Sequence, residues 1–399
     1  MPRSHGPQDQ GRAGSRPVLF LTVFIHLLGF GIIIPLLPYY AETYGACGVT
    51  VGLLAASFSI AQFLFAPVWG RLSDRVGRRP VLLGSLLVTG VSYLVFAIAT
   101  SLPMLFASRI LAGVAGAAIS TAQAYVADTT TPAERTKGMG LIGAAFGMGF
   151  IFGPALGGLL SHWGYAVPAY VAAGFAFVAS IYAFFRLPES LPPALRSEAI
   201  TSRHAPIAFI HALGRPRIGP VLVTFFVATL CFAGMEAMLA LFCEHQYGLR
   251  PEFFGLLLMY VGVVSAVMQL TLVGRLVRRF GERALVRSGL LCMALAFVAC
   301  GIAPPFALFL LAMGVVAVGS GLSTPSLSGL ASLVTPVDEQ GGVLGIYQSL
   351  GSLARAVGPF LGGMAYDHVG AGAPLWLSGS LLSLLALYAA ILPGRRDLA

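Results

Sequence analysis

Charged residues are scarce in this chain. Of its 399 residues, 10% are Asp, Glu, Lys or Arg and 57% are apolar. Soluble globular proteins carry about 25% charged residues, so the charges here are too few to cover a surface that faces water. This excludes a soluble enzyme and a disordered chain. The apolar residues stand in continuous blocks of about 20, the length of a membrane-crossing helix, and not in the alternating segments of a membrane β-barrel.

Cysteine is also rare, and its spacing excludes a disulfide scaffold and a zinc site. None of the five cysteines forms a C-x-x-C pair or a Cys/His ligand pattern. We expect them to pack inside helices, and a disulfide between Cys47 and Cys243 is the open alternative. No G-x-x-x-x-G-K-[ST] sequence is present, so ATP hydrolysis by this chain is unsupported. We expect no metal and no organic cofactor.

Twelve apolar segments are long enough to span a bilayer as helices. They are predicted at residues 18–40, 50–69, 80–99, 103–125, 138–160, 166–186, 219–242, 253–274, 284–303, 305–328, 341–366 and 373–391. The pattern predicts an all-α membrane protein. The first segment is too long for the apolar core of a signal peptide and lacks a small-residue cleavage pattern, so we expect a retained helix.

Positive charge is distributed unevenly around these segments. The net charge is +9, and all but three of the 24 Lys and Arg side chains fall in tails, loops or span ends on one side of the predicted topology. The exceptions are Arg250, on the other side, and Arg109 and Arg355, inside spans. Because cytoplasmic loops carry the excess of Lys and Arg, we expect both termini in the cytoplasm. The basic loops lack the base-reading pattern of a nucleic-acid interface, so no nucleic-acid partner is expected.

A polar segment at residues 188–217, rich in Pro, Ser and charges, predicts a linker between two similar halves. At an offset of about 204 residues, GRLSDRVGRR at 70–79 matches GRLVRRFGER at 274–283, and GPALGG at 153–158 matches GPFLGG at 358–363. Two parallel six-helix halves are typical of transporters whose substrate binds between the halves, near the middle of the membrane.

This division predicts five parts of the chain. They are a cytoplasmic N-terminal tail, a six-helix bundle, a cytoplasmic linker, a second six-helix bundle and a cytoplasmic C-terminal tail, at residues 1–17, 18–187, 188–217, 218–391 and 392–399. The two bundles are expected to be pseudo-symmetric.

Several motifs are similar to those of one transporter family. The loop at 70–79 resembles the signature between helices 2 and 3 of the major facilitator superfamily, and GMGFIFGPALGG at 147–158 resembles the helix-5 motif of its proton-coupled drug antiporters. Arg109 with Gly113, and GFGIIIPLLP at 29–38, resemble the helix-4 and helix-1 motifs of the same group. The chain is thus identified as a member of this superfamily, similar to bacterial tetracycline and multidrug exporters, which implies the major facilitator fold.

The 70–79 loop is the first candidate for a mechanistic role. Gly70 and Gly77 permit a tight reversal between two helices. Asp74 is placed to cap a helix N-terminus or to pair across the interface between the halves. The resemblance implies that this acid holds the inward-closed gate.

The resemblance also implies that Arg75 pairs with an acid at the end of helix 4, where Asp128 stands. Arg78 belongs to the same motif, and the positive-inside rule is sufficient to explain its presence. The second copy of the loop has Arg278 in place of the acid, so we expect an asymmetric gate. Simple topology is the alternative for the whole motif.

The helix-5 motif contains Gly149, Gly153 and Gly157, spaced by four residues, followed by Gly158. Such a stripe lets another helix approach closely, and Pro154 removes a backbone hydrogen bond and bends the helix. We expect this helix to pack against the other half and seal a leak path. Ordinary small-residue packing is the alternative.

Ionisable residues inside spans usually face a cavity and mark a pathway, because a charge at mid-bilayer is costly. Glu236 is the one carboxylate well inside a predicted span. It can accept and release a proton, or attract a cationic substrate, and a structural ion pair with Arg355 is the alternative. Arg109 is linked to proton coupling by resemblance, and a snorkelling arginine is its alternative.

His26 stands where the resemblance implies a helix-1 carboxylate. Imidazole titrates at about pH 6.5 in water, so it can carry a proton, and a hydrogen-bonded packing histidine is the alternative. Candidate substrate contacts are polar or aromatic residues on helices predicted to face the cavity. They are Gln62, Gln123, Tyr260, Gln269, Tyr347 and Gln348.

The primary hypothesis is a monomeric, non-enzymatic exporter in the bacterial inner membrane. It exchanges protons for a hydrophobic or cationic small molecule by alternating access, with the proton gradient as its energy source. A proton-coupled symporter importing a polar metabolite is the first alternative. An intramembrane enzyme or receptor is the second, and His26 lacks the neighbouring ligands that such an enzyme needs.

Overall fold

The computed structural model describes residues 7–116, 118–130, 132–191, 196, 214–336 and 340–394. Over these residues every regular element is a helix. The helices are α1 (Pro7–Ile33), α2 (Leu37–Glu42), α3 (Gly48–Val76), α4 (Arg78–Ala97), α5 (Leu102–Ala115), α6 (Ala118–Thr129), α7 (Pro132–Leu160), η1 (Ser161–Trp163), α8 (Ala166–Arg186), α10 (Gly219–Tyr247), α11 (Pro251–Val267), η3 (Met268–Val273), α12 (Gly274–Phe280), α13 (Glu282–Gly301), α14 (Phe306–Leu333), α15 (Gln340–His368), α16 (Ala373–Tyr388) and η4 (Ala389–Ile391).

The helices match the predicted membrane spans. Within the described residues, ten helical segments are long and apolar enough to cross a membrane. The two remaining predicted spans correspond to α1, whose apolar part is Val18–Ile33, and to α15. The prediction of an all-α membrane protein is confirmed, and its helices are consistent with twelve crossings. The predicted span at residues 103–125 corresponds to α5 and α6, which together form the single span candidate Leu102–Thr129.

The chain divides into two compact units. Unit 1 comprises Met1–Leu36 with Ile60–Thr201, and unit 2 comprises Leu37–Ser59 with Ser202–Ala399. The boundary inside α3 therefore differs from the sequence-based division between bundles. The predicted domain limits stay a prediction, and most of the predicted linker at 188–217 lies outside the described residues.

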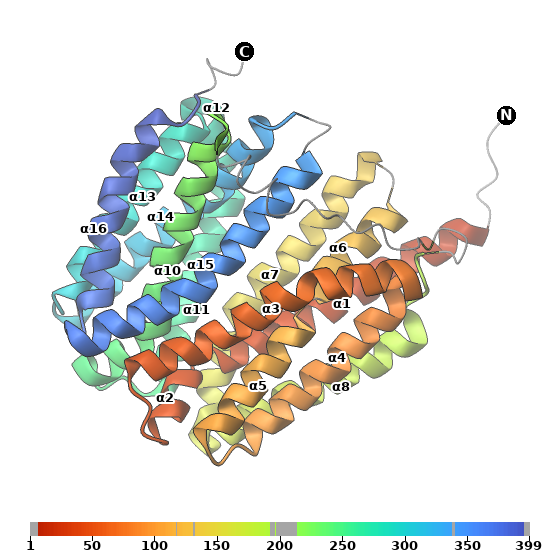
Figure 1. Cartoon of the computed structure of the whole chain (residues 1–399), viewed down its shortest axis with the longest axis horizontal. Coiled ribbons are helices and arrows are strands. Elements are labelled where there is room, and N and C mark those ends of the chain that lie inside the picture. The colour runs from red at the N-terminus through yellow and green to blue at the C-terminus, as the bar shows by residue number, and fades with distance from the viewer. Residues whose placement is uncertain are drawn as a thin grey trace. The chain divides into compact units, whose positions relative to one another are not determined.

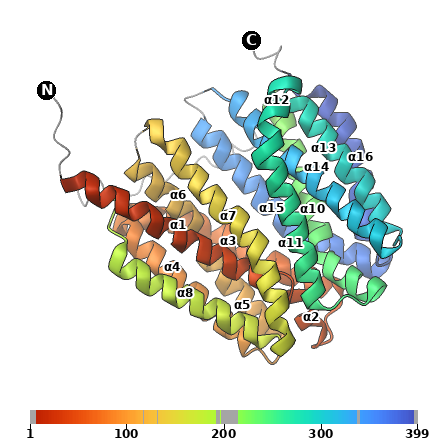
Figure 2. The ribbon, with the colours of Figure 1, turned by 180° about the vertical axis from the view of Figure 1, so that it is seen from behind.

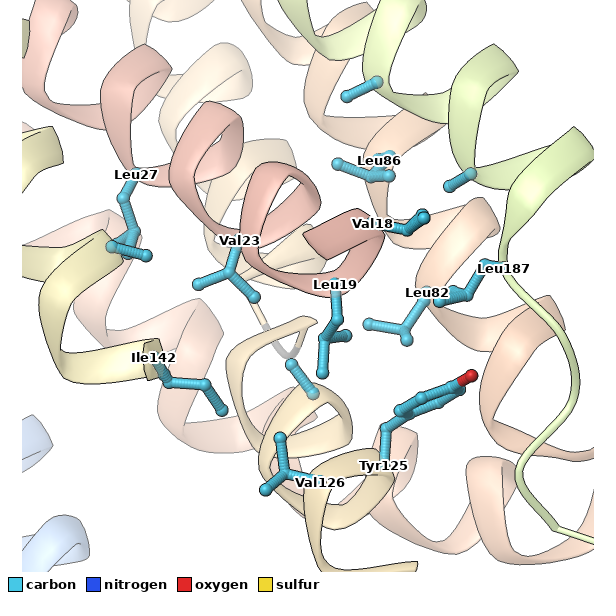
Figure 3. Packing of buried hydrophobic residues seen from close by; sticks show 14 residues of the cluster. Val18, Leu19, Val23, Leu27, Leu82, Leu86, Tyr125, Val126, Ile142 and Leu187 are labelled. Atoms are coloured by element: carbon cyan, nitrogen blue, oxygen red, sulfur yellow. The ribbon is translucent and has the colours of Figure 1, made fainter. Parts of the chain in front are cut away.

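Unit 1 is built around α1, which lies against α7 and α8, while α4 packs on α5 and α8 (Figure 1). Its core joins buried side chains of five helices, among them Leu19 and Val23 of α1, Leu82 of α4, Tyr125 of α6 and Ile142 of α7 (Figure 3). The interior of this unit is thus a continuous apolar cluster, as expected for helices whose close packing holds a membrane bundle together.

Unit 2 repeats this arrangement. Here α10 lies against α15, as α1 lies against α7 in unit 1, and α13 packs on α14 and α16 (Figure 2). The turn that precedes α4 and the turn that precedes α13 are also equivalent. Each is made by a glycine with positive φ, Gly77 at +109° and Gly281 at +81°, a conformation that side-chain-bearing residues rarely adopt. The internal repeat seen in the sequence is therefore present in the packing.

The first residues of α3 are bound within unit 2 by Asp367 of α15. Its two carboxylate oxygens accept hydrogen bonds from the backbone N–H groups of Gly48 and Val49, both at 2.8 Å. A carboxylate at a helix N-terminus satisfies free N–H groups and complements the helix dipole. This contact helps explain why the start of α3 groups with α15.

Candidate functional site

The loop between α3 and α4 holds a network of charges. The guanidinium of Arg78 lies 2.6 Å from the carboxylate of Asp74 and 3.1 Å from that of Asp128. It also donates to the hydroxyl of Ser73 at 2.6 Å. Because Gly77 reverses the chain directly before it, Arg78 at the start of α4 points back to the ends of α3 and α6. One arginine thus joins two acids from different helices.

This network corrects the expected partner of Asp128. The sequence predicted a pair between Arg75 and Asp128, but the ion pair is formed by Arg78. Arg75 is exposed in the last turn of α3, and no described acid forms an ion pair with it. The physical reason is the glycine reversal, which directs Arg78, at the start of α4, toward α6, while Arg75 stays in the last turn of α3.

Sequence reasoning missed Glu189, which lies just after α8. Its carboxylate accepts hydrogen bonds from the backbone N–H groups of Arg78 at 2.8 Å and Arg79 at 3.3 Å. Asp128 also accepts a hydrogen bond from the Ser190 hydroxyl at 3.2 Å. An acid that follows a predicted span and can reach the N-terminus of another helix was the available signal. The first loop is therefore held by three acids.

The helix-5 stripe packs against α1. A Cβ added to Gly149 would lie 2.8 Å from Leu27, and one added to Gly153 would lie 2.7 Å from Gly31. Gly157 contacts Ile32 in the same way, and Gly158 is buried. The nearest neighbours of the stripe thus belong to α1 of the same unit, and the expectation that this helix packs against the other half and seals a leak path stays a prediction. The stripe lets α1 and α7 touch along their backbones.

The prolines of both glycine-rich helices lie inside continuous helix. Pro154 is within α7 and Pro359 is within α15. In the second copy, Gly358 and Gly362 of α15 approach the backbone of α10 at Leu230 and Gly234. The motif therefore serves the same packing role in each unit, which is the alternative that the sequence left open.

The end of α5 accepts hydrogen bonds from side chains of neighbouring helices. Carbonyl oxygens of residues 114–116 accept hydrogen bonds from the Trp69 indole at 2.6 Å, the Ser85 hydroxyl at 2.8 Å and the Gln62 amide at 3.3 Å. Gln62, a candidate substrate contact, therefore has a structural role that accounts for its amide.

His26 lies inside unit 1. Its imidazole is buried, and Nδ1 is 3.4 Å from the hydroxyl of Thr89 on α4. This environment favours the hydrogen-bonded packing histidine over a proton carrier open to water.

Arg109 is buried in α5 beside α4. Its guanidinium stands over the ring of Phe96, 5.2 Å from the ring centre, and interacts electrostatically with Tyr93. Its Nε and Nη2 atoms have no hydrogen-bond partner in the described structure. The cation–π contact compensates part of the cost of burying this charge, and a snorkelling arginine is not what the structure shows.

Glu236 and Arg355 are placed on facing helices of unit 2. Glu236 is partly buried in α10, and Arg355 is exposed on α15. The two charges interact electrostatically, but no ion pair within 4.0 Å joins these two described residues. The Arg355 guanidinium instead contacts Ser352 at 3.4 Å. Among the described residues, Glu236 is therefore a carboxyl in an apolar helix with one cation nearby and no ion-pair partner.

The remaining candidate substrate contacts differ in their surroundings. Tyr347 is buried and stacked on Phe225 with ring centres 3.6 Å apart. The Tyr260 hydroxyl points at Gly314, and Gln269 bonds Ser265 at 3.2 Å within its own helix. Gln348 is exposed and Gln123 is partly buried. The predicted cavity between the two bundles stays a prediction.

All five cysteines are free. Cys47 and Cys243 are among them, so the disulfide that the sequence left open is not formed.

Comparison with known proteins now decides the family. A family model described as "Major Facilitator Superfamily" matches residues 19–282 and 237–398. The chain belongs to the major facilitator superfamily. The protein is thus a multi-pass membrane transporter, and the family assignment from the sequence motifs is confirmed.

Its relatives cover nearly the whole chain. "Multidrug resistance protein 2" of Bacillus subtilis (strain 168) is 33% identical over 355 residues, which are 88% of each protein. "Tetracycline resistance protein, class B" of Escherichia coli is 29% identical over 95% of this chain and 94% of the relative. The crystal structure of the human organic anion transporter MFSD10 (TETRAN) matches with a TM-score of 0.72 and 27% identity, covering 96% of this chain and 100% of that one.

Proposed function

We propose that this transporter exports a hydrophobic, cationic drug-like compound in exchange for protons by alternating access. Its relatives include multidrug and tetracycline resistance proteins of similar length, which supports drug export. The proposal places the protein in the bacterial plasma membrane as a monomer, with both termini in the cytoplasm as the distribution of Lys and Arg predicts.

The observation that supports the proposal is the placement of Glu236 in the apolar helix α10, where no described residue forms an ion pair with it. An ionised carboxylate in an apolar helix attracts either a proton or a cationic substrate, since each removes its uncompensated charge. The two ligands therefore compete for one group. Competition at a site that opens alternately to each side produces exchange. The carboxylate releases the substrate on one side, binds a proton there and carries that proton back to the other side.

A second candidate function follows from the exposed guanidinium of Arg355. A proton on Glu236 removes the negative charge that partly neutralises Arg355, and so favours an anionic substrate there. Proton and anion then bind together, which produces symport. The likeness to a human organic anion transporter supports this candidate, which is also the chemistry of a proton-coupled importer of a polar metabolite. The sign of the substrate charge thus separates antiport from symport.

The test uses the purified full chain in proteoliposomes with an imposed pH gradient. Wild type is expected to accumulate a lipophilic cation such as ethidium against the concentration gradient of that cation. Accumulation is expected only when the imposed pH gradient drives protons in the direction opposite to that of the cation. Glu236→Gln is expected to abolish this accumulation and to retain counterflow of labelled ethidium. The matched control is Glu252→Gln, since Glu252 pairs with the exposed Arg250 at 3.2 Å near the start of α11.

Three results would contradict antiport of a cation. The first is accumulation by Glu236→Gln at the wild-type level. The second is equal loss in the Glu252→Gln control. The third is accumulation of an organic anion with protons moving in the same direction and with loss in Arg355→Gln, which would establish the second candidate.

A further inference from the structure

The turn between α12 and α13 lines a cavity of about 840 Å³ in unit 2. Four arginines surround it, Arg278 and Arg279 from α12 and Arg283 and Arg287 from α13. Glu282 is the one acidic residue of its lining, so the four guanidinium groups leave an excess of positive charge. Such a cavity is suited to an anion.

The contacts described for these arginines are a hydrogen bond and a ring contact, not ion pairs. Arg283 donates to the backbone carbonyl of Ala390, and Arg279 lies over the ring of Phe280, 5.3 Å from its centre. Within the described part of the chain, no carboxylate forms an ion pair with any of the four. Positive-inside topology explains why arginines stand here, but it does not require them to surround a cavity.

The cavity is also lined by exposed apolar side chains from two segments that are apolar enough to cross a membrane. Phe280 is 56% exposed and Leu291 is 46% exposed, and both line the cavity. Leu291 lies within Glu282–Gly301, one of the helices apolar enough to cross the membrane. The guanidinium groups therefore stand where lipid headgroups are found, with apolar surface beside them for acyl chains.

We propose that this cavity binds the phosphate-bearing headgroup of an anionic phospholipid. The planar guanidinium forms paired hydrogen bonds with phosphate oxygens, and basic pockets between membrane helices at this level bind anionic headgroups. The volume is far larger than one phosphate ion, which leaves room for a glycerol-linked headgroup. The site is independent of the proposed proton coupling.

The test measures lipid binding to the purified full chain in neutral detergent by native mass spectrometry. Wild type is expected to bind phosphatidylglycerol more tightly than phosphatidylcholine. Arg278→Gln with Arg287→Gln is expected to weaken phosphatidylglycerol binding by about thirtyfold, at roughly 1 kcal/mol for each arginine near the surface. The matched control is Arg71→Gln with Arg75→Gln, which removes the same charge from exposed positions of the first loop.

A second pair of variants guards against misfolding. Arg278→Lys with Arg287→Lys keeps the charge, and an intermediate loss of phosphatidylglycerol binding is expected because an ammonium cannot form the paired bonds. Equal affinity for the two lipids, or an equal loss in the Arg71/Arg75 control, would overturn the proposal. Pyrophosphate that binds as tightly as phosphatidylglycerol would assign the cavity to a free phosphate compound and would also overturn it.

Discussion

The two copies of the repeated loop, 70–79 and 274–283, have the same backbone reversal but differ in the arrangement of their charged residues. Both reverse the chain at a glycine with positive φ. In the first copy, Arg78 is held by Asp74 and Asp128. In the second copy, the arginines have no acidic partner among the described residues and surround a cavity.

The sequence offset accounts for this difference. At 204 residues beyond Asp74 stands Arg278, and at the same distance beyond Asp128 stands Ser332. Glu282 takes the place of Arg78. A duplicated scaffold can therefore become a closed charge network in one half and an open basic site in the other through three substitutions. The reversal itself depends only on the glycine.

The largest effect is expected from exchanging the charge order of the first loop. Asp74→Arg with Arg78→Glu gives it the order of the second copy and places two carboxylates near each other at Asp128. We expect transport in proteoliposomes to fall by about tenfold or more, because charged hydrogen bonds worth roughly 1.5–3 kcal/mol are lost. Wild-type transport with an unchanged melting temperature would show that the network has no mechanistic role.

The next effect compares the two glycines. Gly77→Ala and Gly281→Ala are each expected to cost about 1–3 kcal/mol, because both require a backbone conformation that alanine avoids. The loss should be larger for Gly77, whose added Cβ would contact the Glu189 carboxylate, while Gly281 has open space. Thermal unfolding of the purified variants measures this order. A larger loss for Gly281→Ala would contradict the contacts described at Gly77.

Glu189→Gln tests the missed acid of the first loop. It keeps a hydrogen-bond acceptor for the backbone of α4 but removes the negative charge at that helix N-terminus. We expect a loss of about 0.3–1 kcal/mol in unfolding free energy, smaller at high salt. Thermal unfolding at low and high NaCl checks both parts, and a loss that is independent of salt would argue against a charge effect.

The smallest effect is expected for Arg75→Ala. Because Arg75 is exposed and forms no ion pair with a described acid, its stability should change by less than about 0.5 kcal/mol. The control in the same loop is Arg78→Ala, which leaves two acids unpaired. If Arg75→Ala is as destabilised as Arg78→Ala in thermal unfolding, the assignment of the Asp128 partner is incorrect.

Much of the fold was predictable, and some of the site was not. The apolar blocks located the helices, and the repeated motifs revealed the equivalence of α1–α7 and α10–α15. The motifs also found Asp74, Arg78 and Asp128 as a group. They did not assign the right arginine to Asp128, because Arg75 and Arg78 stand on opposite sides of the reversal at Gly77 and only Arg78 is directed toward α6.

Other features depend on neighbours far apart in the sequence. Nothing in a single motif places Glu189 at the start of α4, or brings Trp69, Ser85 and Gln62 to the end of α5. The contact of His26 with Thr89 likewise requires knowing which face of α1 turns toward α4.

From the order of its amino acids alone, the chain could be recognised as a membrane protein of two related halves, because burial in lipid demands long apolar helices whatever their partners are. Packing alone assigned the arginines, Arg78 to a closed network and Arg278 and Arg287 to an open cavity. A charge is neutralised or left available by the groups that lie within a few ångströms of it, and only the folded chain brings those groups together.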